Sequence, residues 1–166
     1  KAIAERLKSA NREERKKIYA VMYDELFAKV PDHPRLMRRE NEVDTRRANR
    51  TKFALTRTEI DKSTVFGEFA PGDCRFVMEV APHVKQAIGI DISDQRNPAD
   101  PVPENFKLIV YDGYNLDEIQ DNTLDILFSD QLIEHFHPED TEYHFQIAHR
   151  ILKPGGKYIF RTPNRL

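Results

Sequence analysis

The sequence lacks the features of a disulfide-stabilised, secreted or membrane-spanning protein. Among its 166 residues there is one cysteine, Cys74, so no internal disulfide can form. No apolar run approaches the roughly 18 residues that a membrane-spanning helix needs. The chain also does not open with a charged segment followed by an apolar one, so no secretory signal is indicated. A single thiol fits a reducing compartment, and we expect a cytoplasmic location with no membrane partner.

An excess of charge of one sign is lacking too. The 26 basic and 28 acidic side chains give a formal net charge of −2, so no overall field favours nucleic acid, and nucleic-acid binding is not expected. Acids are interspersed among the basic residues that gather between positions 35 and 62, which is typical of a solvated helix face; a functional basic patch is the alternative. These basic residues are Arg35, Arg38, Arg39, Arg46, Arg47, Arg50, Lys52, Arg57 and Lys62.

Residues 1–60 have helical periodicity, and we interpret them as a cap or lid. Asn11 and Glu14 have the spacing of a capping box, and apolar residues follow at helical spacing up to Leu26. Pro31 and Pro34 predict that this helix ends before residue 31, and a more charged helix is predicted over residues 43–55. A helical layer that merely covers a sheet edge is the alternative to a lid.

Residues 61–166 are predicted to form an α/β core. Short β-rich runs at 64–69, 87–92, 106–111, 124–128 and 157–161 are separated by helical patterns at 74–81 and 140–152. This alternation indicates a Rossmann-like, mostly parallel sheet with helices on both faces. Prolines at 98, 101 and 103 predict an extended loop between the second and third strands, and the Lys-Pro-Gly-Gly run at 153–156 predicts a turn into the last strand.

Candidate ligand-binding residues follow the strands, because ligands of parallel sheets bind beyond the carboxyl ends of the strands. The first strand leads into a loop of acidic and small residues that lets backbone approach a ligand closely. Asp91 ends the second strand, 19 residues after Gly72, and its two oxygens suit the adjacent hydroxyls of a ribose. Asp112 and Gly113 follow the third strand, and Ser129 follows the fourth.

Taken in order, this set resembles the class I S-adenosylmethionine-dependent methyltransferases, in particular the small-molecule, type 11-like group. The resemblance covers about residues 64–165 and includes the runs at 124–129 and 152–156. It implies S-adenosylmethionine as cofactor, a seven-stranded sheet with a largely parallel core, and an acceptor bound beside the fourth and fifth strands. Two strands of that pattern are missing and Lys1 is not a methionine, so we expect the chain to be part of a longer protein.

The resemblance also implies individual roles. Ala70 and Cys74 stand where glycines are usual in the first loop, Asp91 matches the ribose acid, and Asp112 matches the acid near the adenine amine. Residues 129–132 match the stretch that lines the methionine moiety. The expected cofactor-binding residues are Glu68, Ala70, Gly72, Cys74, Asp91, Ile92, Asp112, Gly113, Ser129 and Gln131.

A dinucleotide cofactor is disfavoured by the same loop. A pyrophosphate is bound by a G-x-G-x-x-G turn at an unobstructed helix N-terminus. Here the third glycine is absent, and Asp73 would repel the anion. A sulfonium cation tolerates both Glu68 and Asp73, so the loop favours S-adenosylmethionine.

Glu134 and His135 are the expected catalytic residues. Methyl transfer depends mainly on placing the acceptor and excluding water, and a base helps when the acceptor is a hydroxyl. The resemblance places this pair near the methyl group, and a histidine titrates near neutral pH. The alternative is that His135 only caps or fills a helix edge. Four tyrosines are expected either to orient an acceptor or only to pack: Tyr19, Tyr23, Tyr111 and Tyr114.

A metal site is not expected, because the histidines at 135, 137, 144 and 149 lack ligand spacing and no cysteine supports them. The leading hypothesis is therefore methyl transfer from S-adenosylmethionine to a small-molecule or carrier-bound acceptor. The alternative is a non-catalytic methyltransferase-like domain that binds a protein partner or RNA through its N-terminal helices. A nicotinamide-dependent oxidoreductase is a third hypothesis. The sequence indicates neither the acceptor nor an oligomeric state.

Overall fold

Five parallel strands form one sheet in the order β3-β2-β1-β4-β5. This is seen in a computed structural model, which describes residues 2–32 and 42–163. The strands are β1 (Val65–Phe69), β2 (Gln86–Asp91), β3 (Phe106–Val110), β4 (Leu124–Asp130) and β5 (Leu152–Arg161). The predicted Rossmann-like fold class is thus confirmed.

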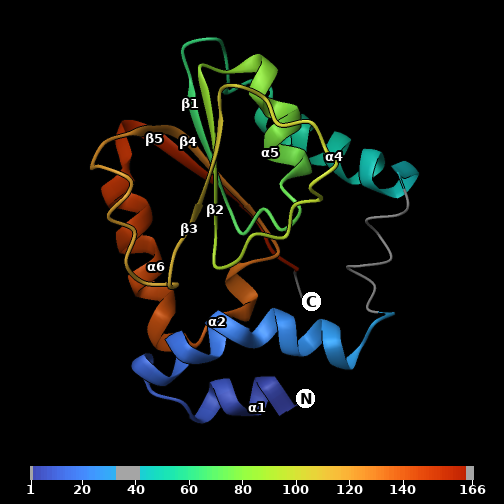
Figure 1. The fold of residues 1–166 in the computed structure, drawn as a ribbon. Helices are drawn as coiled ribbons and strands as arrows, with labels where there is room; N and C mark the ends of the chain where they lie inside the picture. The colour runs from blue at the N-terminus through green and yellow to red at the C-terminus, as the bar shows by residue number, and fades with distance from the viewer. Residues whose placement is uncertain (1, 33–41, 164–166) are drawn as a thin grey trace.

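Helices cover both faces of the sheet, which explains why the central strands are buried at nearly every position. All five residues of β1 are buried. On one face lie α5 (Arg75–Val80) and α4 (Glu42–Thr56), where Phe76 of α5 and Phe53 of α4 pack with Phe66 of β1 (Figure 1). On the other face lies α6 (Pro138–Ile151), whose Ile151 packs with Phe69 of β1.

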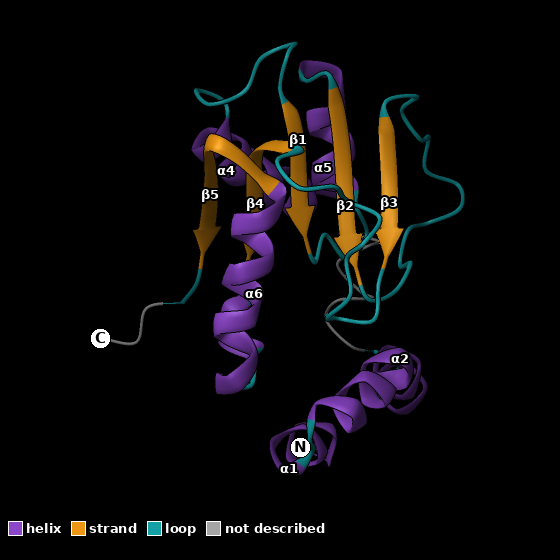
Figure 2. Cartoon of the chain, turned by 90° about the vertical axis from the view of Figure 1, so that its left-hand side faces the viewer, coloured by secondary structure: helices purple, strands orange, loops and turns teal. Residues whose placement is uncertain are grey.

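Two further helices lie beyond the carboxyl ends of the strands. They are α1 (Ala2–Ser9) and α2 (Arg12–Lys29), and the strand arrowheads in Figure 2 point toward them. The predicted capping box of α2 is confirmed, because Asn11 Oδ1 accepts from the Glu14 N–H at 3.0 Å and Glu14 Oε2 accepts from the Asn11 N–H at 2.8 Å. As predicted, α2 ends before Pro31. Residues 2–9 were predicted as helical only within the 1–60 segment, and α1 was not predicted as a separate helix.

Two connections test the loop predictions. Residues 92–105, between β2 and β3, contain neither helix nor strand, as their prolines predict. The run at 153–156 is different, because β5 begins at Leu152 directly after α6 and the Pro-Gly-Gly segment lies inside it as an irregularity of register. Gly155 has φ +83°, and a Cβ on Gly156 would lie 2.9 Å from the Lys153 carbonyl oxygen, so both glycines are needed by the strand itself.

The predicted boundary near residue 60 separates α1, α2 and α4 from the sheet, but α4 packs directly on the core. Asn49 of α4 donates a hydrogen bond to Glu79 Oε2 of α5 at 2.8 Å. Across residues 2–32 and 42–163, no helix has both the length and the apolar character needed to cross a membrane.

Candidate functional site

A cavity of about 1400 Å³ opens at the carboxyl ends of the strands. Its wall on the core side comes from the segments that follow β1, β2, β3 and β4. Its other wall comes from α1, α2 and α4. Apolar and aromatic side chains such as Tyr19, Met22 and Leu26 come from α2, whereas α4 contributes mainly polar and charged ones. The sheet and the N-terminal helices therefore enclose one common space.

The loop after β1 has an unusual backbone. Ala70, Gly72 and Cys74 have φ values of 52°, 61° and 61°, so three alternate residues lie in the left-handed region. For a residue with a side chain this conformation costs about 1–2 kcal/mol. This requirement explains why glycine suits all three positions, and why Ala70 and Cys74, two small residues, are strained there.

Asp91 holds this loop against β2. Its Oδ2 accepts a hydrogen bond from the Gly72 N–H at 3.0 Å, and its Oδ1 accepts one from the Ile92 N–H at 2.7 Å. The side chain is 4% exposed and lines the cavity. A carboxylate has about four acceptor sites, and these two backbone bonds use two of them.

Glu68 and Lys52 form a buried ion pair beside the loop. Glu68 Oε1 lies 3.2 Å from Lys52 Nζ, and within the described residues Glu68 Oε2 has no hydrogen-bond partner. Burial raises the pKa of Glu68, and the Lys52 ammonium opposes that rise. Lys52 Nζ also lies 4.0 Å from Asp130 Oδ2, so this one cation faces the ends of both β1 and β4.

The two predicted residues after β3 have different surroundings: one stabilises the local turn and the other lines the cavity. Asp112 does not line the cavity; its Oδ1 accepts from the N–H groups of Tyr114 at 2.8 Å and Asn115 at 2.6 Å. Gly113 does line the cavity, with φ +89°, and a Cβ there would lie 3.1 Å from the Tyr19 ring. Gly113 therefore allows α2 to approach the end of β3 closely.

Ser129, at the end of β4, begins a short polar chain. Ser129 Oγ lies 2.8 Å from Tyr158 Oη, which lies 2.7 Å from His144 Nε2. His144 lines the cavity and packs against the rings of Phe69 and Phe136, and burial lowers its pKa to about 4. His144 is therefore neutral at physiological pH.

The predicted catalytic pair lies on the cavity wall. Glu134 and His135 fall in a short 3-10 helix, η2 (Ile133–His135), and both side chains are exposed and line the cavity. Glu134 Oε2 accepts a hydrogen bond from Thr162 Oγ1 at 3.1 Å. His135 is thus accessible to a ligand in the cavity.

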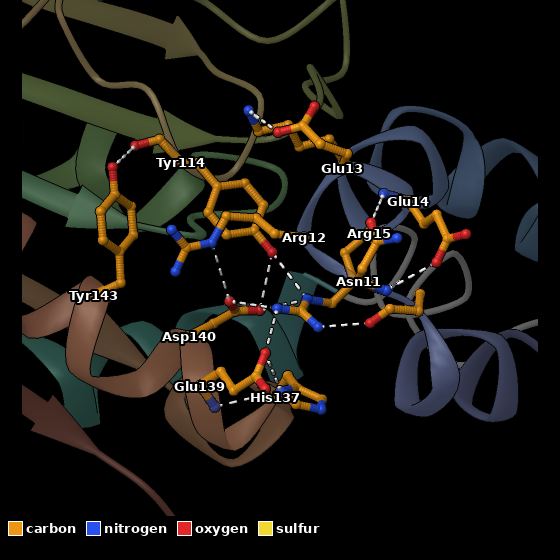
Figure 3. A network of polar contacts seen from close by, with 12 residues as sticks. Asn11, Arg12, Glu13, Glu14, Arg15, Tyr114, His137, Glu139, Asp140 and Tyr143 are labelled. Carbon is orange, nitrogen blue, oxygen red and sulfur yellow. Dashed lines mark hydrogen bonds and ion pairs between the residues drawn. The ribbon is translucent and has the colours of Figure 1, made fainter.

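A buried arginine joins α2 to the core (Figure 3). Arg15, 1% exposed, donates from Nε to Tyr114 Oη at 3.1 Å and from Nη2 to Asp140 Oδ1 at 2.9 Å. Tyr114 Oη donates to Asp140 Oδ2 at 2.9 Å, and Arg15 Nη1 donates to the Ala10 carbonyl at 2.7 Å. The guanidinium therefore fixes the cap helix over the cavity.

The remaining histidines do not gather into a cluster. Nowhere in residues 2–32 and 42–163 do three or more histidine, cysteine, aspartate or glutamate side chains form a group that could hold a metal ion. His137 caps α6 by accepting from the Glu139 N–H, and His149 is exposed.

Eight of the twelve predicted site residues line the cavity, and four lie behind its wall. The eight are Ala70, Gly72, Asp91, Ile92, Gly113, Gln131, Glu134 and His135. The four are Glu68, Cys74, Asp112 and Ser129, of which Glu68, Cys74 and Ser129 are buried. All four tyrosines line the cavity, but the hydroxyl of Tyr114 is already engaged by Arg15 and Asp140.

Lys52, His144 and Arg15 were missed as site residues. Lys52 belongs to the basic segment that was interpreted as a solvated helix face, and that interpretation is wrong for this residue, whose side chain is 16% exposed. Arg46, Arg47 and Arg50 of the same helix are exposed, as expected, while Arg35, Arg38 and Arg39 lie outside the described residues. The charged residues around Lys52 gave no signal in the sequence that its side chain faces inward.

Comparison with known families decides the assignment. Residues 68–160, more than half of the chain, match the methyltransferase domain family. The chain belongs to this family. The resemblance inferred from the motifs is thereby confirmed, and with it an enzyme family whose cofactor is S-adenosylmethionine. No curated protein sequence matches the chain.

Solved structures with the same fold include several methyltransferases. Phosphoethanolamine N-methyltransferase 1 of Haemonchus contortus, solved with phosphoethanolamine and S-adenosylhomocysteine, has a TM-score of 0.70 at 16% identity over 92% of this chain. A Haloferax volcanii complex that contains the Trm112 methyltransferase activator gives 0.59 at 21% over 72%. An S-adenosylmethionine-dependent methyltransferase of Mesorhizobium loti gives 0.53 at 18% over 63%.

At these identities the structures show the fold alone. The matches cover 33%, 54% and 48% of those three chains, so this chain spans about half of their length or less.

Proposed function

We propose that this protein transfers the methyl group of S-adenosylmethionine to a small-molecule or carrier-bound acceptor. The observation that carries the proposal is the bond between Gly72 and Asp91, which fixes a left-handed loop and a buried carboxylate side by side on one cavity wall. Close backbone and a two-oxygen acceptor are what a nucleoside with a ribose diol requires.

The residues present fit such a cofactor. Asp91 would accept from the ribose hydroxyls, Ile92 and Gly113 would border the base, and the loop at 70–72 would lie against the nucleoside. Behind this wall, Glu68 Oε2 is a buried acceptor that lacks a donor among the described residues, and a carboxylate there is compatible with a cationic ligand in the cavity. When bound, the cofactor supplies an electrophilic methyl group on a sulfonium.

The chain itself would place the acceptor and exclude water. The apolar residues of α1 and α2 close the cavity opposite the loop, and Arg15 holds α2 in position. His135 is proposed to accept a proton from a hydroxyl acceptor, with Glu134 beside it on η2. Ordering of cofactor and acceptor in one enclosed space is the main source of rate enhancement for such a displacement.

Calorimetric titration of the full-length protein tests the proposal. We expect S-adenosylhomocysteine to bind with micromolar affinity, and NAD not to bind. Absence of S-adenosylhomocysteine binding would sink the methyltransferase proposal. Binding of the cofactor together with retention of a protein or RNA partner, but no methylation of any acceptor class, would instead favour the non-catalytic alternative.

A further inference from the structure

Lys52 is placed where the far end of an adenosyl amino acid would lie. Neighbouring strands follow the order β2-β1-β4, and Phe69 of β1 is the register partner of Ser129 of β4. A ligand whose ribose is held at Asp91, the end of β2, and that extends along the strand ends therefore reaches the ends of β1 and β4. Lys52 Nζ lies at that point, 3.2 Å from Glu68 Oε1 and 4.0 Å from Asp130 Oδ2.

An amino-acid group carries an ammonium and a carboxylate, and carboxylates outnumber cations at this end of the cavity. Asp73 and Asp130 line the wall and Glu68 lies behind it, so an ammonium would find carboxylates on several sides. A carboxylate needs a cation. Arg161, the other cation on this wall, is held by both oxygens of Asp130 at 2.6 and 2.7 Å.

The remaining cations on the cavity wall are worse placed. Arg15 is committed to Tyr114, Asp140 and the Ala10 carbonyl. Lys8 and Arg47 are exposed side chains on α1 and α4. Lys52 is 16% exposed, and its ammonium carries three N–H groups, of which Glu68 uses one in a hydrogen bond.

We propose that Lys52 binds the carboxylate of the amino-acid end of the cofactor. Glu68 holds the ammonium of Lys52 in place for this contact. This inference rests on the proposed function. It assigns a cofactor contact to α4, a helix that precedes the matched methyltransferase region at 68–160. The cap then takes part in cofactor binding as well as in enclosing the acceptor.

The test compares two ligands of the full-length protein by calorimetry. S-adenosylhomocysteine carries the amino-acid end, and 5′-methylthioadenosine keeps the adenosine and the thioether but lacks it. Lys52→Met should weaken S-adenosylhomocysteine binding about tenfold or more, since a charge-assisted bond is lost, and should change 5′-methylthioadenosine binding less than about threefold. Lys52→Arg should keep most of the preference for S-adenosylhomocysteine over 5′-methylthioadenosine. Lys107→Met, an exposed change on β3 away from the cavity, serves as the matched control.

Lys52→Met leaves Glu68 as a buried carboxylate without its counter-ion, and this could unfold the variant. A second pair of variants therefore repeats the comparison without the buried charge. Glu68→Gln is compared with the double variant Glu68→Gln/Lys52→Met, in which no such charge remains. We expect the preference for S-adenosylhomocysteine over 5′-methylthioadenosine to fall about tenfold between these two.

An equal loss for both ligands, or an unchanged preference, would overturn the role of Lys52 and show it to be a counter-ion of Glu68 only. That result, with S-adenosylhomocysteine still bound by the unaltered protein, would leave the proposed function standing. Failure of the unaltered protein to bind either ligand would overturn both.

Discussion

The Gly72 N–H donates a hydrogen bond to Asp91 Oδ2 across 3.0 Å, which joins the loop after β1 to the end of β2. The same carboxylate also accepts from the Ile92 N–H at 2.7 Å. One side chain therefore determines both the conformation of the loop and the acceptor that faces the cavity.

Replacing Asp91 should weaken cofactor binding through both effects. Asp91→Ala removes the acceptor and frees the Gly72 N–H, and we expect S-adenosylhomocysteine affinity to fall by about 1–3 kcal/mol, measured by calorimetry. Asp91→Asn keeps the shape but offers only one acceptor oxygen, so an intermediate loss is expected. Asp117→Ala, at an exposed position outside the cavity wall, is the control. Unchanged affinity in Asp91→Ala would refute the role of this residue.

Relieving the strained loop should stabilise the protein. Ala70 has φ 52°, so Ala70→Gly is expected to raise the free energy of unfolding by up to about 1 kcal/mol in a urea titration. Ala99 is an exposed loop residue that is not among the described residues with positive φ. Ala99→Gly should therefore lower the free energy of unfolding slightly, by roughly 0.5 kcal/mol, because glycine increases the conformational entropy of the unfolded chain. Equal effects of the two changes would argue against backbone strain at Ala70.

Removing the buried arginine should detach α2. Arg15→Met leaves Asp140 buried without its main cation, and loss of one partner of a buried pair costs about 3–5 kcal/mol. The expected readout is a lower urea midpoint and faster amide hydrogen exchange within residues 12–29. Arg12 lies 4.0 Å from the same carboxylate with its side chain 46% exposed, so Arg12→Met should cost at most about 1 kcal/mol. Similar costs for the two variants would contradict the anchoring role of Arg15.

Acid should destabilise the protein through His144. Burial lowers its pKa in the folded state to about 4, below the ordinary value of 6.5, so the folded state favours the neutral ring. This contribution is complete above about pH 6.5 and is lost as the pH falls toward 4, amounting to about 2 kcal/mol between pH 7 and 5. The measurement is the free energy of unfolding at these two pH values.

In His144→Phe that part of the pH dependence should disappear, because the variant lacks the titrating ring. His149→Gln, an exposed substitution on the same helix, should retain it. The same pH dependence in His144→Phe as in the unaltered protein would rule out His144 as its source.

The order of elements was predictable because each strand and helix carries its own local signal. The apolar runs of β1 and β2, the capping box at Asn11 and the proline at 31 act over a few residues, so the sequence contains them directly. The carboxyl ends of parallel strands lie at one edge of the sheet, and Gly72, Asp91 and Gly113, which follow or end these strands, all line the cavity there.

Contacts between distant segments were not predictable in this way. Lys52 belongs to a helix with many exposed charges, and only the position of β1 makes it a buried partner of Glu68. His144 looked like one of several helix histidines until packing enclosed it with Phe69 and Tyr158. The helix α1 has only eight residues, fewer than the roughly 11–18 over which periodicity is assessed, so it was not predicted as a separate helix.

The bond between Arg15 and Asp140 spans 125 residues of sequence, and Tyr114 lies 99 residues from the same arginine. Such a contact closes a very long loop, which is entropically costly until the sheet and α6 have formed. During synthesis α2 emerges early yet has no anchor until the first turn of α6 has followed it. We therefore expect the cavity to be completed late in folding, and α1 and α2 to be the first part of the chain to open again under mild denaturation.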